Sequence, residues 1–108
     1  MSKIEAKLAE MGYPLPEVAK PVAAYVASVV TGNLCFTAGQ LPFVNGALPM
    51  TGKVGRDVSA EDAKDLARLC ALNALAALKL AIGDLDRVTR IVKVVGFVSV
   101  VPEFTAIP

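Results

Sequence analysis

Hydrophobic residues recur with helical spacing in two parts of the chain. Near the N-terminus, Ile4 and Leu8 share one face of a predicted helix over residues 2–11, with charged residues around them. Ser2 and Glu5 have the spacing of a capping box. Prolines follow at positions 14 and 16, and they favour an extended connection. We therefore expect an N-terminal helix and a proline-rich connection over residues 1–19.

A second, longer helix is predicted from Ser59 to Gly83. Ser59 suits the N-cap, acidic residues occupy the first turn, and Gly83 suits the C-terminal stop. After Arg68 the helix is apolar on almost all sides until Lys79, which indicates burial against a sheet and a possible neighbouring chain. Asn73 interrupts the apolar face. An unpaired buried amide is costly, so we expect Asn73 to bond to a loop or strand backbone rather than to a ligand.

A valine-rich segment and the apolar segment that follows it predict a β-hairpin. The strands are expected at Ala23–Thr31 and Leu34–Gln40, with Gly32-Asn33 as the turn between them. Asn45-Gly46 is a second hairpin signal. The segment Leu48–Gly55 is expected to be a short strand or a loop. A further strand is predicted after the long helix.

That last segment, Val88–Val101, is long and rich in β-branched residues. Both of its faces are apolar beyond Lys93, which is typical of a central strand covered on both sides. Lys93 itself is expected to reach solvent or pair at an interface, with a site role as the alternative. The order β-β-(β)-α-β predicts an α+β fold in which one helix leaves a sheet face uncovered. Another subunit or further chain has to cover that face.

Composition excludes several classes of chemistry. The 108 residues suit one domain, and the net charge of +1 gives no basic field for nucleic acid. There is no histidine, so imidazole bases and histidine-liganded zinc are excluded. No leader peptide or apolar stretch of membrane-spanning length is evident, which predicts a cytoplasmic protein. The hydrophobic content of 55% favours an oligomer over an unusually apolar monomer.

A few side chains are candidates for chemistry. Tyr25 either hydrogen-bonds a ligand or packs as an ordinary strand tyrosine. Thr37 and the backbone of Gly39 either face a small anion or form a bulge before a turn. Cys35 and Cys70 have no activating neighbours in the sequence, so we expect two inert thiols.

Several segments, in this order, resemble the RidA/YjgF family, also called endoribonuclease L-PSP or reactive-intermediate deaminases. The resemblance covers residues from about 20 to 108, and the N-terminal segment fits a subfamily with a longer N-terminus. The best single marker is Gly-Asn-x-x-x-Thr-x-Gly-Gln over residues 32–40. The other matching pieces are Tyr25-Val26, Ala71–Leu75, Arg90–Val98 and Pro102–Phe104.

The resemblance implies a chorismate-mutase-like α+β fold with helices on one face of the sheet. It also implies a homotrimer with a barrel-like core and a small carboxylate-bearing metabolite bound in clefts between subunits. The implied activity is hydrolysis of 2-imino and 2-enamino acids to 2-keto acids and ammonia, with no metal or organic cofactor. A membrane or a nucleic acid is not an expected partner.

The resemblance carries over to few site residues. Tyr25 matches a cleft tyrosine and Gly39 matches a backbone position of the cleft, while Thr37 is a candidate only through its place at the end of the strand. Ala38 stands where many members have a serine. The family's substrate-clamping arginine and a later glutamate have no counterpart here, so the chain resembles a domain without its C-terminal segment.

We therefore expect feeble or no activity from these 108 residues. The alternative functions are a non-catalytic trimeric module that binds small metabolites or acts like a chaperone and, less favoured, an endoribonuclease or translation inhibitor.

Overall fold

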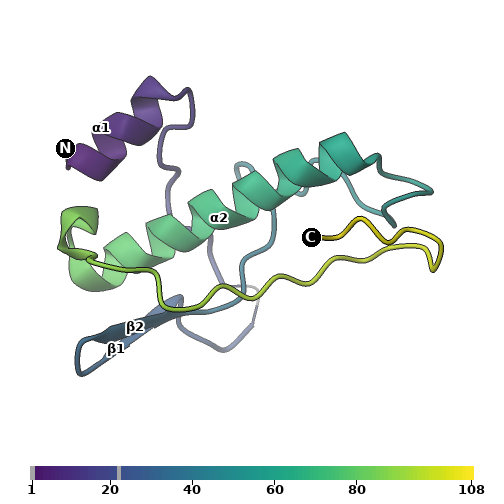
Figure 1. The fold of residues 1–108 in the computed structure, drawn as a ribbon. Helices are drawn as coiled ribbons and strands as arrows, with labels where there is room; N and C mark the ends of the chain where they lie inside the picture. The colour runs from purple at the N-terminus through teal and green to yellow at the C-terminus, as the bar shows by residue number, and fades with distance from the viewer. Residues whose placement is uncertain (1, 22) are drawn as a thin grey trace.

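The computed structural model describes residues 2–21 and 23–108. The elements follow one another as α1 (Lys3–Glu10), β1 (Ser28–Thr31), β2 (Leu34–Thr37), α2 (Ala60–Ile82) and the 3₁₀ helix η1 (Leu85–Arg87). Long α2 crosses the molecule, with the β1–β2 hairpin on one side of it and α1 near its C-terminal end on the other (Figure 1). The predicted α+β class is confirmed in this small fold.

The β1–β2 hairpin forms as the sequence predicts, but it is shorter. The two strands pair antiparallel from Ser28 opposite Thr37 to Thr31 opposite Leu34, around a two-residue turn. Gly32 begins that turn with a φ of 59°, a conformation that glycine adopts without steric cost. Residues 23–27, predicted as strand, instead contain bends and a turn closed by the Tyr25 N–H and the Ala23 carbonyl.

Helix α2 begins and ends where the sequence signals it. The Ser59 hydroxyl accepts a hydrogen bond from the Asp62 N–H at 3.1 Å, and Gly83 ends the helix with a φ of 84°. Its buried residues are Leu72, Asn73, Ala76 and Ala77, and this face contacts both strands. The core is small. Of its other described hydrophobic members, Leu85 lies in η1, and Ala27, Val54 and Val58 lie in connections.

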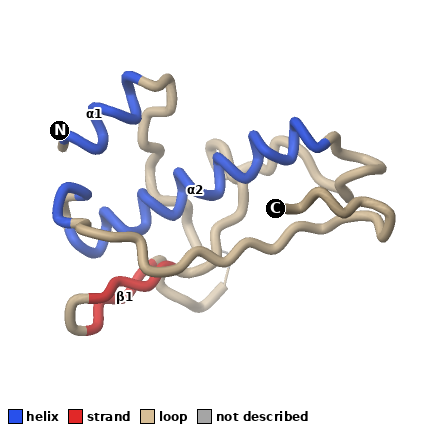
Figure 2. Tube along the Cα trace, viewed as in Figure 1, coloured by secondary structure: helices blue, strands red, loops and turns tan. Residues whose placement is uncertain are grey.

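The segment Val88–Val101 is not the central strand that its sequence predicts. Within the described chain its one ladder contact is a parallel bridge between Val100 and Val54, and the rest is drawn as an extended loop (Figure 2). The side chains of Val94 and Phe97 are 82% and 95% exposed. The apolar pattern is right for a covered strand, but a strand forms only where a neighbour pairs with its backbone. The described chain places no such neighbour beside residues 89–98.

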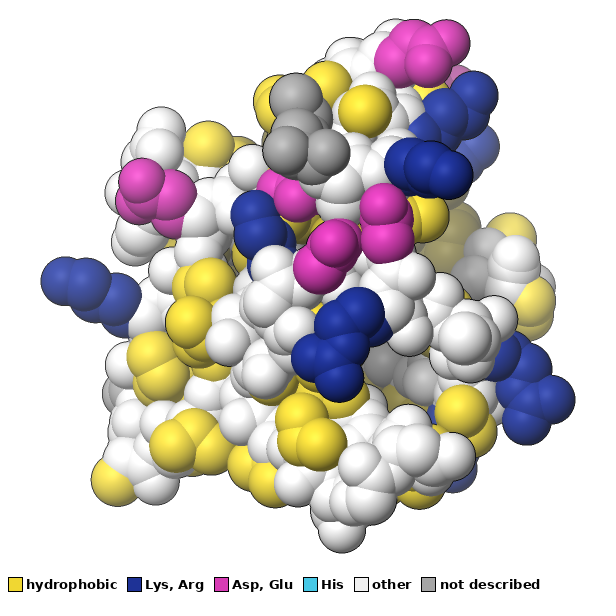
Figure 3. Space-filling view, turned by 90° about the vertical axis from the view of Figure 1, so that its left-hand side faces the viewer, with side chains coloured by type: hydrophobic (Ala, Val, Ile, Leu, Met, Phe, Trp, Pro, Cys, Tyr) yellow, Lys and Arg dark blue, Asp and Glu magenta, His cyan; other side chains and the backbone are white. Residues whose placement is uncertain are grey.

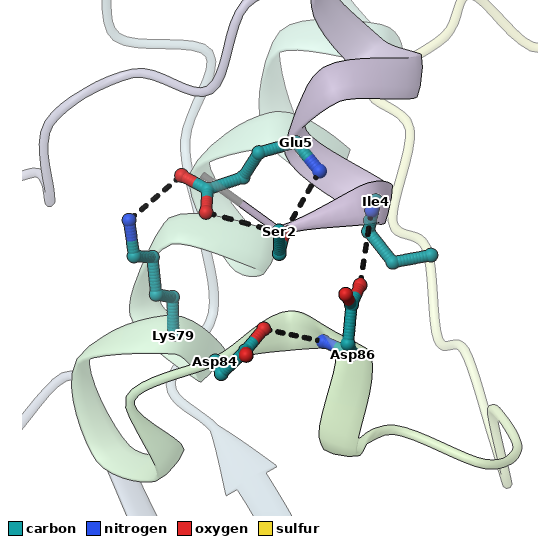
Figure 4. Close-up of polar contacts among 6 residues, drawn as sticks. All are labelled: Ser2, Ile4, Glu5, Lys79, Asp84 and Asp86. Atoms are coloured by element: carbon teal, nitrogen blue, oxygen red, sulfur yellow. Dashed lines mark hydrogen bonds and ion pairs between the residues drawn. The ribbon is translucent and has the colours of Figure 1, made fainter.

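Polar contacts attach α1 to the rest of the fold. The Asp86 carboxylate accepts hydrogen bonds from the N–H groups of Lys3 and Ile4 at 2.8 and 3.0 Å. Figure 4 shows the contact with Ile4 and the ion pair of Glu5 with Lys79 of α2, at 2.7 Å. None of the described side chains of α1 is buried. Charged side chains gather on the face where α1 meets the end of α2 (Figure 3). Hydrogen bonds to Asp86 and the Glu5–Lys79 ion pair, rather than an apolar interface, therefore hold α1 against the rest of the fold.

Candidate functional site

A small pocket of about 20 Å³ lies between the connection that leads into β1 and the loop that leaves β2. Ala27, which is buried, lines it beside Tyr25, and the opposite wall comes from the loop over residues 39–43. A pocket of this size holds one small polar group, about the size of a single water or a ligand's head group. The described lining residues are Ala19, Lys20, Pro21, Tyr25, Ala27, Gly39, Gln40, Leu41 and Phe43.

The structure brings two of the four predicted ligand-binding residues to this pocket. Tyr25 and Gly39 lie on its two walls, although they are fourteen positions apart in sequence. Among the described residues, neither Thr37 nor Ala38 lines it. Thr37 is the exposed end of β2, and the Ala38 N–H bonds to the Ala27 carbonyl at 2.8 Å. The Ala38 carbonyl accepts a hydrogen bond from Gln40 Nε2 at 3.2 Å.

Asn73 holds one wall of the pocket in place. Its side chain is 3% exposed, and its Nδ2 donates to the carbonyls of Leu41 and Phe43 at 3.0 and 3.2 Å. The prediction that Asn73 bonds to loop backbone is therefore confirmed. The same helix face also binds β1, because the Ser28 hydroxyl donates to the Ala77 carbonyl at 2.7 Å. Helix α2 thus fixes both the hairpin and the pocket loop.

Lys20 and Gln40 are lining residues that the sequence reasoning did not single out. Lys20 is the one charged side chain among the described lining residues. Its position in the connection, directly before Pro21, gives no sequence signal that would single it out as a site residue. Gln40 belongs to the segment of residues 32–40 that carries the family resemblance. It directly follows Gly39 in the sequence, which brings it to the same pocket.

The other candidate residues do not line the small pocket. Cys35 and Cys70 are free thiols, and burial raises the pKa of Cys70, which keeps its thiol protonated and inert at neutral pH. Lys93 is exposed on the extended segment. Within residues 2–21 and 23–108, no cluster of three cysteine, aspartate or glutamate side chains is arranged to hold a metal ion. In the same residues, no helix combines the length and the apolar character that crossing a bilayer requires.

A second, more open groove of about 540 Å³ lies between the proline-rich connection and α2. Leu15, Pro16 and Val18 form one side of it, and Ala76 and Leu80 form the other. The Glu5–Lys79 ion pair stands at its edge. This groove lies on the α1 side of α2, and its lining residues do not include those of the small pocket.

The chain matches known proteins along nearly its whole length. The family described as "YjgF/chorismate mutase-like, putative endoribonuclease" matches residues 5–106. Protein TCP17 of Trypanosoma cruzi is 38% identical over 103 residues, which are 95% of this chain and 64% of that protein. The 2-iminobutanoate/2-iminopropanoate deaminase of Escherichia coli K12 is 39% identical over 72 residues, 67% of this chain and 52% of that enzyme.

Solved structures match as well. The protein Atu1372 from Agrobacterium tumefaciens is 45% identical with a TM-score of 0.84, covering 94% of this chain and 61% of that one. A Shewanella oneidensis protein whose structure is titled "putative endoribonuclease" is 37% identical with a TM-score of 0.72, covering 77% of this chain and 55% of that one. The chain thus spans between about half and just under two thirds of the length of these relatives. Its sequence and its fold together place the chain in the RidA/YjgF family.

Proposed function

We propose that the protein hydrolyses small 2-imino and 2-enamino acids to 2-keto acids and ammonia. In this reaction water adds to the imine carbon, the carbon–nitrogen bond breaks, and nitrogen leaves as ammonia while the carbonyl forms. An enamine first takes a proton at carbon to become the imine. The observation that carries the proposal is the pocket that Tyr25, Gly39 and Gln40 line together. The 39% identical Escherichia coli relative is named for such a reaction.

The pocket residues suit the recognition of a small polar substrate. The phenol of Tyr25 and the amide of Gln40 are both able to donate and to accept hydrogen bonds. Lys20 gives the lining a positive charge, and the described lining contains no carboxylate to oppose it. A carboxylate-bearing imine therefore meets complementary charge. In this proposal the Tyr25 hydroxyl orients the substrate.

The test is keto-acid release from iminopropanoate generated in situ from alanine by an amino-acid oxidase. We expect pyruvate to form measurably but only modestly faster with the protein than in buffer, in line with the feeble activity expected from these 108 residues. Tyr25→Phe should lower kcat/KM by at least about tenfold, because one well-placed hydrogen bond to a reacting group contributes roughly 1.4 kcal/mol or more.

Tyr13→Phe is the matched control for that variant. Tyr13 is the chain's other tyrosine, and its ring stacks under Arg68, 4.5 Å from the guanidinium carbon. The Tyr13→Phe substitution should leave the rate of pyruvate formation unchanged. A wild-type rate equal to the buffer rate contradicts the proposal.

Metabolite binding without turnover is a second candidate. The described lining offers Tyr25 and Lys20 as its ionisable groups and no carboxylate to activate water. Binding of pyruvate together with no acceleration of imine hydrolysis would favour this function. RNA cleavage, which the name of the Shewanella structure suggests, has less support here because the net charge is +1 and the chain has no histidine.

The proposal includes a homotrimer with the site near a subunit boundary. Support comes from the exposed apolar side chains of the extended segment, which a single described chain leaves uncovered: Ile91, Val92, Val94, Val95, Phe97 and Val98. Burial of such a surface in an oligomer is strongly favoured by the hydrophobic effect.

A further inference from the structure

We infer that Lys20 is the residue of this chain that recognises the carboxylate of the ligand, an inference that rests on the proposed function of the pocket. Lys20 lies on the wall formed by residues 19–21, opposite the loop over residues 39–43. It is the one charged side chain in the described lining. A carboxylate that enters the pocket therefore lies beside a lysine and meets no acidic residue of the described lining.

The dimensions of the pocket support a head-group site. Its volume of about 20 Å³ admits one small polar group and not a whole amino acid. The ligand then enters with one end, and the rest of it extends over the surface outside. Of the two polar ends of a 2-imino acid, the carboxylate carries the full negative charge, and Lys20 selects that end.

The neighbouring groups complete the recognition. Gln40 lies on the opposite wall, and one of its amide hydrogens is engaged with the Ala38 carbonyl at 3.2 Å. The amide has a second hydrogen with which to donate to a ligand oxygen. The loop over residues 39–43 is held to α2 by the hydrogen bonds that Asn73 donates to the carbonyls of Leu41 and Phe43. A flexible lysine on one wall thus closes over a head group held against a fixed loop.

Lys20 also accounts for specificity. Its side chain is solvent-exposed, so the contact with a carboxylate is screened by water and salt and contributes modestly to affinity. It discriminates between charged and neutral ligands rather than anchoring a ligand tightly. The protein should accordingly prefer a 2-keto or 2-imino acid over the corresponding amide.

The experiment measures the binding of pyruvate and of pyruvamide by NMR titration of the wild-type protein and three variants. Lys20→Met removes the charge but keeps the length of the side chain, and Lys20→Arg keeps the charge. Lys64→Met removes an exposed lysine on α2 and serves as the control.

We expect Lys20→Met to raise the dissociation constant for pyruvate about threefold to fivefold. Lys20→Arg and Lys64→Met should leave that constant near the wild-type value. Pyruvamide should bind wild type and Lys20→Met equally weakly, and added salt should weaken pyruvate binding to wild type more than to Lys20→Met.

Two results would overturn the inference: pyruvate affinity equal in wild type and Lys20→Met, or no measurable pyruvate binding by wild type. The imine-hydrolysis assay separates this inference from the proposed function. Lys20-dependent pyruvate binding without imine hydrolysis removes the proposed function and leaves the carboxylate site. Imine hydrolysis with the same KM in wild type and Lys20→Met removes the role of Lys20 alone.

Discussion

Asn73 is the residue on which the geometry of the candidate site depends most directly. Its amide donates to two carbonyls of the pocket loop and is almost fully buried. Asn73→Ala should lower the free energy of unfolding by about 1–3 kcal/mol, because two part-buried carbonyls lose their donor. Urea denaturation followed by circular dichroism measures this change.

Asn73→Asp tests the direction of those hydrogen bonds. The aspartate has the same size, but at neutral pH it places acceptor oxygens against the two carbonyls. We expect it to destabilise the protein at least as much as Asn73→Ala does. A harmless Asn73→Asp would mean that the two hydrogen bonds do not stabilise the loop.

Gly55 is a second residue with a specific structural demand. Its φ is 94°, and a Cβ built there would lie 2.7 Å from Cγ2 of Val101. Gly55→Ala should therefore lower the free energy of unfolding by roughly 1–3 kcal/mol. Gly39→Ala, at a position with nothing within 4 Å, should change it by no more than about 0.5 kcal/mol. Equal effects in thermal unfolding would contradict this interpretation.

At the residue scale, the sequence predicts which residues take part in local interactions. It does not predict which residues far apart in the chain come together in one site. The buried amide of Asn73 signals itself by interrupting an apolar helix face. Tyr25 and Gly39 stand out as site candidates through their segments. Lys20 gives no such signal, because a lysine before a proline reads as an ordinary connection residue. Only the fold shows that its segment lies opposite residues 39–43.

Helix α1 is the element whose attachment depends most on charge. The Asp86 carboxylate caps its first N–H groups, and these hydrogen bonds hold the pKa of Asp86 below its usual range. The ion pair with Lys79 likewise lowers the pKa of Glu5. A depressed carboxyl pKa contributes stability that is present above the unfolded-state value and is lost as the pH falls through the folded-state value.

We therefore expect α1 to detach in acid before the rest of the fold unfolds. The amide NMR shifts of Lys3 and Ile4 should stay constant from pH 7 to pH 5, then move toward random-coil values below the usual range of Asp and Glu. Asp86→Asn should shift these signals toward random coil already at pH 7. Asp65→Asn, which removes the partner of Arg68 on α2, should leave them unchanged. Unchanged shifts in Asp86→Asn would contradict the capping role.

Element prediction succeeds where the information is local. Both helices have their capping serines, and the hairpin has its glycine turn, so short-range chemistry fixes these boundaries. The segment Val88–Val101 fails because strand formation needs a partner that periodicity does not specify. Its two apolar faces predict a covered strand, whereas the described chain leaves the segment exposed.

At the scale of the whole molecule, the uncovered surface is the feature that most needs an explanation. The exposed side chains of residues 91–98 form one apolar stretch on an extended backbone, interrupted by Lys93 and Gly96. A monomer would present both this surface and unpaired backbone groups to water, which is a hazard for aggregation. The homotrimer that we propose removes this hazard if neighbouring subunits cover residues 91–98. The backbone amides of these residues should then exchange slowly with solvent.

Sedimentation velocity at low micromolar concentration tests this expectation. We expect a trimer for wild type and a shift toward monomer for Phe97→Lys, since a charge at a nearly fully exposed position breaks an interface without disturbing a core. Leu80→Lys is the matched control, because Leu80 is also exposed but lies in the groove on the α1 side of α2. A monomeric wild type, or equal behaviour of the two variants, would contradict the role of this segment. In that case the apolar stretch would have to be covered by something other than a second copy.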